Sequence, residues 1–149
     1  MAVAPGQLVW VRGPNGQGKT SLLRLLAGLS QAADGQIDRH VQLAYIGHQH
    51  GLKDDLNAME ALSFLLRLHD LPFDEQSCTD ALARMGVSKQ RLSPVRALSQ
   101  GQKRRVSLAR LCLSASRKLW ILDEPFDALD GQGITTLNAL IQQHCQNGG

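Results

Sequence analysis

Aromatic residues, cysteines and long hydrophobic runs are scarce in this sequence, and each scarcity disfavours a class of protein. Phe, Trp and Tyr make up 4% of the 149 residues, which argues against single-stranded nucleic-acid binding through stacked bases. Cys78, Cys112 and Cys145 are odd in number and far apart, so we expect reduced thiols and no CxxC metal site. Because no run approaches the roughly 20 apolar residues of a bilayer span, and no basic segment precedes an apolar stretch at the N-terminus, we expect one globular domain that does not itself cross a membrane.

Acidic residues are absent from one long stretch. Residues 84–118 hold ten of the 16 basic residues and none of the 13 acidic ones. Such a block can attract nucleic acid, acidic lipid headgroups or nucleotide phosphates. It can equally be a solvated basic face, and charge alone leaves these alternatives open.

The apolar patterns predict an α/β chain with a helical middle. Strand patterns occur at 7–12, 41–46 and 119–123. Helical spacing occurs at 20–28, 56–70, 76–86, 99–115 and 131–146. The run at 119–123 is apolar up to its final carboxylate, as expected of a strand buried on both faces of a parallel sheet, and the helix ending at Gly28 has the spacing of a buried helix.

A glycine-rich turn, GPNGQGKT at 13–20, separates the first predicted strand from the first predicted helix. It fits G-x-x-x-x-G-K-[ST], whose backbone N–H groups enclose phosphate oxygens at the N-terminus of the following helix. Lys19 would pair with the β- and γ-phosphates, Thr20 would place its hydroxyl on Mg²⁺, and Ser21 is a second candidate hydroxyl. The predicted nucleotide-binding residues of this turn are Gly13, Pro14, Asn15, Gly16, Gln17, Gly18, Lys19, Thr20 and Ser21. An accidental lysine in a glycine-rich turn is the alternative, which the strand and helix around it disfavour.

Two carboxylates follow the strand LWIL. Parallel strands and the phosphate loop end at the same edge of such a sheet, so Asp123 can reach Mg²⁺ there. Glu124 is suited to polarising an attacking water as a general base. Two exposed acids in a turn before Pro125 would be the alternative if this motif stood alone.

The segment LSQGQKRR at 98–105 predicts a second helix start that can bind an anion. Ser99 and Gln102 form a capping-box pattern, and the free amides of Gly101 and Gln102 lie at the positive end of the helix. One nucleotide does not need two such sites from one subunit.

GPNGQGKT, Gln49, LSQGQ, LWILDEP and FDALD occur in the order found in ABC ATPases, and the chain resembles their nucleotide-binding domains. The resemblance implies ATP and Mg²⁺ as cofactors and a P-loop NTPase fold with a RecA-like core. That core would comprise residues 1–49 and 116–149, and residues 50–115 would form an inserted helical subdomain carrying the signature motif.

The resemblance also implies a homodimer across two ATP molecules. Ser99 and Gly101 of one subunit would contact the γ-phosphate held by the other, and Gln100 and Gln102 belong to the same predicted nucleotide-binding set; Gln100 stands where the family usually has glycine. Gln49 resembles the glutamine that binds Mg²⁺ and water. Asp130 resembles an aspartate that contacts the opposite subunit, although it could also cap the last helix.

The stretches IGHQHGLKDDLNAMEAL, SQGQKRRVSLARL and LWILDEPFDALD are similar to the ATP-binding subunits of haem exporters in cytochrome c biogenesis. This narrower resemblance implies an ATPase bound peripherally to integral membrane subunits, at the cytoplasmic face of the inner membrane, without specific nucleic-acid binding. The alternatives are a soluble, non-transporting ABC ATPase, for example in iron–sulfur assembly, and a nucleic-acid module built on the basic block.

Relative to the family pattern, we expect a domain truncated at both termini. An upstream aromatic that stacks on adenine and a downstream strand ending in a switch histidine would be missing, and with them a central strand of the sheet. None of the five histidines, His40, His48, His50, His69 and His144, can be given the switch role. Metal binding by His48 and His50 would need further ligands.

Overall fold

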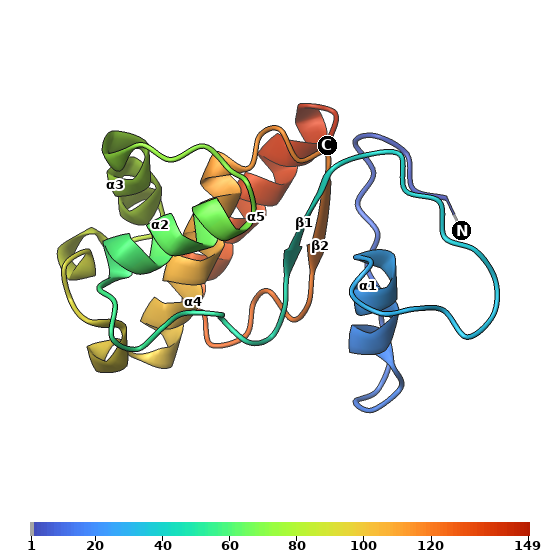
Figure 1. The fold of residues 1–149 in the computed structure, drawn as a ribbon, viewed down its shortest axis with the longest axis horizontal. Coiled ribbons are helices and arrows are strands. Elements are labelled where there is room, and N and C mark those ends of the chain that lie inside the picture. Colours follow the sequence, from blue (N-terminus) through green and yellow to red (C-terminus); the bar gives the residue numbers. More distant parts are fainter. Residues whose placement is uncertain (1) are drawn as a thin grey trace.

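The computed structural model describes residues 2–149, in which a group of helices and α1 lie on opposite sides of a short parallel sheet (Figure 1). The α-helices are α1 (Lys19–Leu26), α2 (Ala58–Leu68), α3 (Glu75–Arg84), α4 (Gln100–Ala109) and α5 (Gly131–Gln146). The strands are β1 (Leu43–Ile46) and β2 (Leu119–Leu122), and three short 3-10 helices are η1 (Ser88–Gln90), η2 (Val95–Ala97) and η3 (Arg110–Leu113). None of the helices within residues 2–149 is long and apolar enough to span a bilayer.

The two strands pair in parallel, as predicted, with Leu43 opposite Leu119 and Ile46 opposite Leu122. Successive side chains of a strand point to opposite faces, so Ile46 and Leu122 pack into the helical cluster. Ile121, only 5% exposed, belongs to the other face. Burial of β2 on both faces is nevertheless incomplete, because Ile121 alone among its four residues is fully buried.

The prediction of a strand at 7–12 is wrong. The segment is irregular, and Leu8 and Trp10 are each 65% exposed. An extended segment becomes a strand only when a neighbouring backbone completes its hydrogen bonds. Within residues 2–149 no strand pairs with it, since β1 and β2 pair with each other.

The prediction that the first helix is buried is also wrong, whereas its end was predicted correctly. None of the residues of α1 is fully buried, and Leu22 is 40% exposed. Gly28 takes a φ of 78°, which glycine adopts without strain. Its N–H donates to the carbonyl of Leu25 (3.0 Å), and the N–H of Leu29 donates to that of Arg24 (2.9 Å). These two bonds form a Schellman motif, which satisfies carbonyls at the helix end.

The other α-helices begin at side-chain caps. Asn57 accepts from the N–H of Glu60 and donates its own N–H to the Glu60 carboxylate, both at 2.9 Å, so α2 starts after residue 57 and not at 56. Ser99 and Gln102 form the predicted capping box at α4. The predicted helix 99–115 ends as an α-helix at Ala109 and continues as the 3-10 helix η3.

One hydrophobic cluster joins the sheet to the helices. Its fully buried members include Ile46 of β1, Leu62 of α2, Leu82 of α3, Leu108 of α4 and Leu137 of α5. Residues assigned from sequence to the catalytic core and to the helical subdomain therefore share this core. The division at residues 49 and 116 stays a prediction.

Replacement of Leu62 by alanine should lower the free energy of unfolding by about 2–5 kcal/mol, because its side chain is fully buried and leaves a cavity. Leu68→Ala in the same helix is the matched control, since Leu68 is 62% exposed; its effect should stay within about 0.5 kcal/mol. Urea denaturation followed by circular dichroism measures both, and equal losses in the two variants would contradict the core described above.

Candidate functional site

The glycine-rich turn and the start of α1 form one wall of a cavity. Gly18 caps α1 with a φ of 79°, which turns the chain sharply into the helix. The Lys19 ammonium donates to the carbonyls of Gly13 (2.8 Å) and Pro14 (2.9 Å). The cavity, of about 270 Å³, is lined by Asn15, Gly16, Gly18, Lys19, Thr20, Ser21 and Glu124. A cation, a helix N-terminus and free backbone amides here converge as an anion site requires.

Thr20 and Asp123 meet across 103 residues of sequence. The Thr20 hydroxyl donates to Oδ1 of Asp123 at 3.2 Å, and Asp123 is 2% exposed. Its other carboxylate oxygen, Oδ2, is buried without a hydrogen-bond partner. A buried carboxylate oxygen needs compensation, and Mg²⁺ takes oxygen ligands of this kind. The residues present therefore fit a magnesium ion beside the phosphate cavity.

Arg104 connects the ends of the two strands. Its guanidinium, on α4 and 1% exposed, donates to the carbonyl of Gly47 after β1 at 2.8 Å. It also donates to the carbonyls of Asp123 (3.0 Å), Glu124 (2.7 Å) and Pro125 (3.4 Å) after β2. Burial lowers the pKa of Arg104, while nearby carboxylates oppose that shift. These four carbonyls compensate the loss of water around the charge.

This arginine also explains the backbone of Glu124. Glu124 has a φ of 47°, in the left-handed region that a non-glycine residue occupies at a cost of about 1 kcal/mol or more. Such a conformation persists only where neighbouring contacts hold it, and the bond from Arg104 to the Glu124 carbonyl is such a contact. This backbone conformation accompanies the position of Glu124 in the lining of the cavity.

The signature residues lie at the start of α4, outside the cavity lining. Ser99 and Gln100 are exposed, and a Cβ on Gly101 would come within 2.7 Å of the Ala128 carbonyl, so only glycine fits there. Asp130 caps α5 by accepting from the Gly133 N–H at 2.8 Å, and Arg105 of α4 also donates to it. The Gly133 N–H is the main cause of its lowered pKa.

The predicted site residues therefore fall into two groups. The structure brings together the phosphate turn, Thr20, Asp123 and Glu124. A second group, Ser99, Gln100, Gly101, Gln102 and Asp130, gathers where α4 and α5 begin. Gln49 joins neither group; it is exposed on the bend after Gly47.

Part of the basic block is exposed, as expected of a solvated face, but three of its arginines are buried. Arg104, Arg105 and Arg110 are 1%, 9% and 7% exposed. Arg110 donates to the Tyr45 carbonyl, and burial, followed by repulsion from Arg104, lowers its pKa to about 10. These arginines hold backbone together and do not contribute to a surface for nucleic acid.

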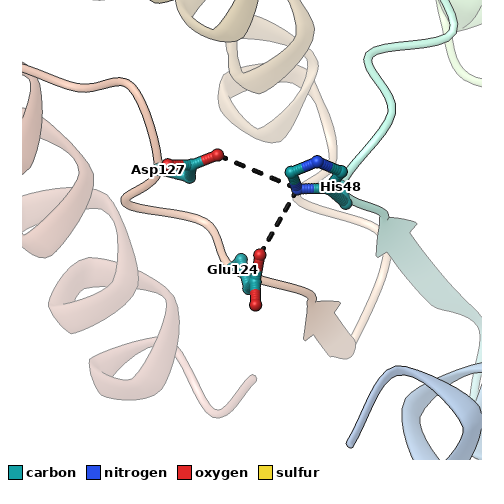
Figure 2. A group of neighbouring side chains, drawn as sticks. All are labelled: His48, Glu124 and Asp127. Carbon is teal, nitrogen blue, oxygen red and sulfur yellow. Dashed lines mark ion pairs between the residues drawn. The ribbon is translucent and has the colours of Figure 1, made fainter. Parts of the chain in front are cut away.

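Sequence reasoning missed Arg104, although a signal was present. Arg104 lies one helical turn before Leu108, so both face the same side of α4. Sequence reasoning also left His48 without further ligands. In the structure His48 lies beside Glu124 and Asp127 (Figure 2).

Known proteins resemble this chain both in sequence and in fold. The ABC transporter family profile matches residues 1–127. The cytochrome c biogenesis ATP-binding export protein CcmA of Aromatoleum aromaticum is 46% identical, with 99% of this chain and 74% of the relative covered. CcmA of Vibrio cholerae is also 46% identical, with 97% of this chain and 75% of that relative covered.

Among solved structures, an ABC transporter ATP-binding protein from Pyrococcus furiosus has a TM-score of 0.82 at 22% identity, covering all of this chain and 78% of that one. An ATP-binding subunit of an ABC transporter has a TM-score of 0.84 at 23% identity, covering 100% and 68%.

Replacement of Arg104 by leucine should lower the free energy of unfolding by about 3 kcal/mol, because four carbonyls lose the guanidinium as a donor and only the Glu124 carbonyl keeps another, the Asp127 N–H. Arg104→Lys should restore only part of the loss, since an ammonium cannot match the planar fork. Arg91→Leu is the control at an exposed arginine. Chemical denaturation measures all three variants; an Arg104→Leu protein as stable as the control would contradict the role of this side chain.

Proposed function

Because the chain belongs to the ABC transporter family, whose profile and relatives cover most of it, we propose that it is the ATP-hydrolysing subunit of an exporter in cytochrome c biogenesis. The contact between Thr20 and Asp123 carries the proposal, because it joins the phosphate turn to the buried acid of β2. The CcmA relatives favour this exporter over a soluble, non-transporting ABC ATPase. Haem is the cargo we propose, on the resemblance alone.

The phosphate turn binds the nucleotide in this proposal. Lys19 exchanges its bonds to the Gly13 and Pro14 carbonyls for phosphate oxygens, and the amides at the start of α1 donate to the same anion. Lys19 is thus already held over the turn by weaker, uncharged acceptors. Nucleotide binding replaces them with charge-assisted hydrogen bonds.

Thr20 and Asp123 would hold Mg²⁺, with Gln49 as a further proposed ligand. When bound, the ion neutralises charge on the β- and γ-phosphates. The unpartnered Oδ2 of Asp123 supports this assignment. Gln49 lies on an exposed bend, so its approach to the ion requires that bend to move.

Glu124 acts as the general base. Its carboxylate lines the phosphate cavity and is half exposed, so it can reach a water. It accepts a proton from that water as the water oxygen attacks the γ-phosphorus, and ADP leaves. Arg104 fixes the backbone from which this carboxylate projects.

Two copies of the chain complete the site. The cavity is lined by the phosphate turn and Glu124, while Ser99 and Gly101 lie at the start of α4, outside that lining. A head-to-tail homodimer would place this helix start, with its positive end, on the γ-phosphate held by the other copy. We assign the dimer contact of Asp130 to the same arrangement.

The transporter has membrane subunits, and this chain works on them as a membrane-associated ATPase. We place it at the cytoplasmic face, where ATP is available. In this arrangement residues 50–98, which include α2 and α3, would carry motion from the nucleotide site to the membrane subunits. α2 and α3 pack directly on α4, so they move with the signature helix.

Lys19→Ala in the full-length protein should weaken ATP binding by about 100-fold or more, because it removes a charged donor to the phosphates. Lys89→Ala, at an exposed lysine on η1, is the control and should bind ATP normally. Fluorescent-nucleotide titration measures both. Equal affinity in the two variants would place the phosphates somewhere other than this turn.

Glu124→Gln should leave ATP binding intact and slow hydrolysis by roughly 10²- to 10⁴-fold, since the amide cannot accept the proton. Glu75→Gln, at the exposed start of α3, should hydrolyse ATP at the normal rate. Single-turnover measurements of phosphate release separate chemistry from binding. Unchanged turnover in Glu124→Gln would refute the assigned base.

A further inference from the structure

Three metal-ligating side chains converge beside the phosphate cavity, as Figure 2 shows. Nδ1 of His48 lies 3.4 Å from Oε2 of Glu124 and 3.8 Å from Oδ2 of Asp127. One ligand atom from each residue lies within 4.8 Å of the other two. We propose that His48, Glu124 and Asp127 bind a transition-metal ion of the Zn²⁺ type, and that this ion blocks ATP hydrolysis by holding Glu124.

The three atoms lie farther apart than a direct hydrogen bond and leave room for an ion among them. A hydrogen bond from a ring nitrogen to a carboxylate oxygen spans about 2.7–3.2 Å, and both contacts of His48 are longer. Around a tetrahedral Zn²⁺ with bonds of 2.0–2.2 Å, neighbouring ligand atoms lie about 3.3–3.6 Å apart. The contact between His48 and Glu124 already has this length, and the wider pairs close by rotation of exposed side chains.

The backbone under these ligands is held in place. Arg104 donates to the carbonyls of Gly47, immediately before His48, and of Glu124. The N–H of Asp127 donates to the Glu124 carbonyl at 3.1 Å. All three ligands therefore project from segments tied to one another. A site held in this way loses less conformational entropy when an ion binds.

The ligand set selects the kind of metal. One imidazole and two carboxylates suit Zn²⁺ and its transition-metal neighbours, whereas Mg²⁺ prefers oxygen ligands alone. Three protein ligands leave a fourth position for water, as in open zinc sites. The site shares no ligand with the proposed magnesium site at Thr20, Gln49 and Asp123, so the two ions do not compete for the same side chains.

Metal binding here would prevent hydrolysis without preventing nucleotide binding. A Glu124 carboxylate that coordinates an ion cannot accept a proton from water. Lys19 and the phosphate turn contribute no ligand to the site, so they remain available to ATP. This inhibitory consequence rests on the proposed role of Glu124, whereas metal binding itself does not.

Metal binding is tested on the chelator-treated full-length protein without nucleotide. Zn²⁺ competition with a chromophoric indicator should give one high-affinity site per chain, and Co²⁺ should give the visible absorption of a tetrahedral ion. His48→Ala and Asp127→Asn should each weaken binding by about 10-fold or more, since loss of a ligand costs at least as much as loss of its supporting contacts. His40→Ala and Asp55→Asn, at exposed positions outside the cluster, are the matched controls. Wild-type affinity in His48→Ala, or no binding by the wild type, would overturn the site.

Inhibition is tested separately, at a buffered free Zn²⁺ concentration that accounts for metal bound to ATP. Wild-type turnover should fall as the site fills while ATP affinity is retained, and His48→Ala should keep its turnover. Inhibition of His48→Ala equal to that of the wild type would overturn the inhibitory role. A wild-type protein that binds Co²⁺ at His48 but, once freed of that ion and supplied with Mg²⁺, never hydrolyses ATP would contradict the proposed function and leave the metal site standing.

Discussion

The buried guanidinium of Arg104 is the interaction on which the rest of the site depends. It joins the backbone after β1 to the backbone after β2 through carbonyls on both sides. Without it, the two strand ends would carry unpaired carbonyls and Glu124 would lose the contact that holds its left-handed conformation. The edge of a two-stranded sheet thus becomes rigid enough to place Asp123 under Thr20 and to keep His48 beside Glu124.

The same arginine links α4, which carries the predicted signature residues, to Asp123 and Glu124, the proposed metal ligand and general base. Ser99 caps the start of α4, and Arg104 follows in the second turn of the helix. Gly101 packs against the Ala128 carbonyl, and Arg105 binds Asp130, so α4 also contacts the segment that follows Glu124. A displacement of α4 would therefore shift the backbone that carries Glu124. In the proposed homodimer, contact of Ser99 with the nucleotide of the other subunit could therefore shift the Glu124 backbone of the subunit to which this Ser99 belongs.

Local patterns in the sequence predicted the parts of the fold that are locally determined. The phosphate turn, the Ser99 capping box, the end of α1 at Gly28 and the position of Asp123 after β2 all follow from short motifs with a fixed geometry. The failures involve partners that are distant in sequence. Segment 7–12 has the alternation of a strand but no neighbour to pair with in residues 2–149, and α1 lacks a second covering layer there. From the sequence alone Arg104 is indistinguishable from a surface charge, because the carbonyls that surround it belong to distant segments. The grouping of His48 with Asp127 likewise depends on two loops that meet only in the folded chain.

The central claim is that the second half of the phosphate site comes from another copy of the chain. Disulfide crosslinking tests it most directly, with Cys78, Cys112 and Cys145 replaced and new cysteines placed at Asn15, in the cavity lining, and at Ser99. We predict a disulfide between subunits that forms with ATP bound and is largely lost without nucleotide. A protein that binds ATP but never forms this disulfide, or forms it equally without nucleotide, would contradict the account.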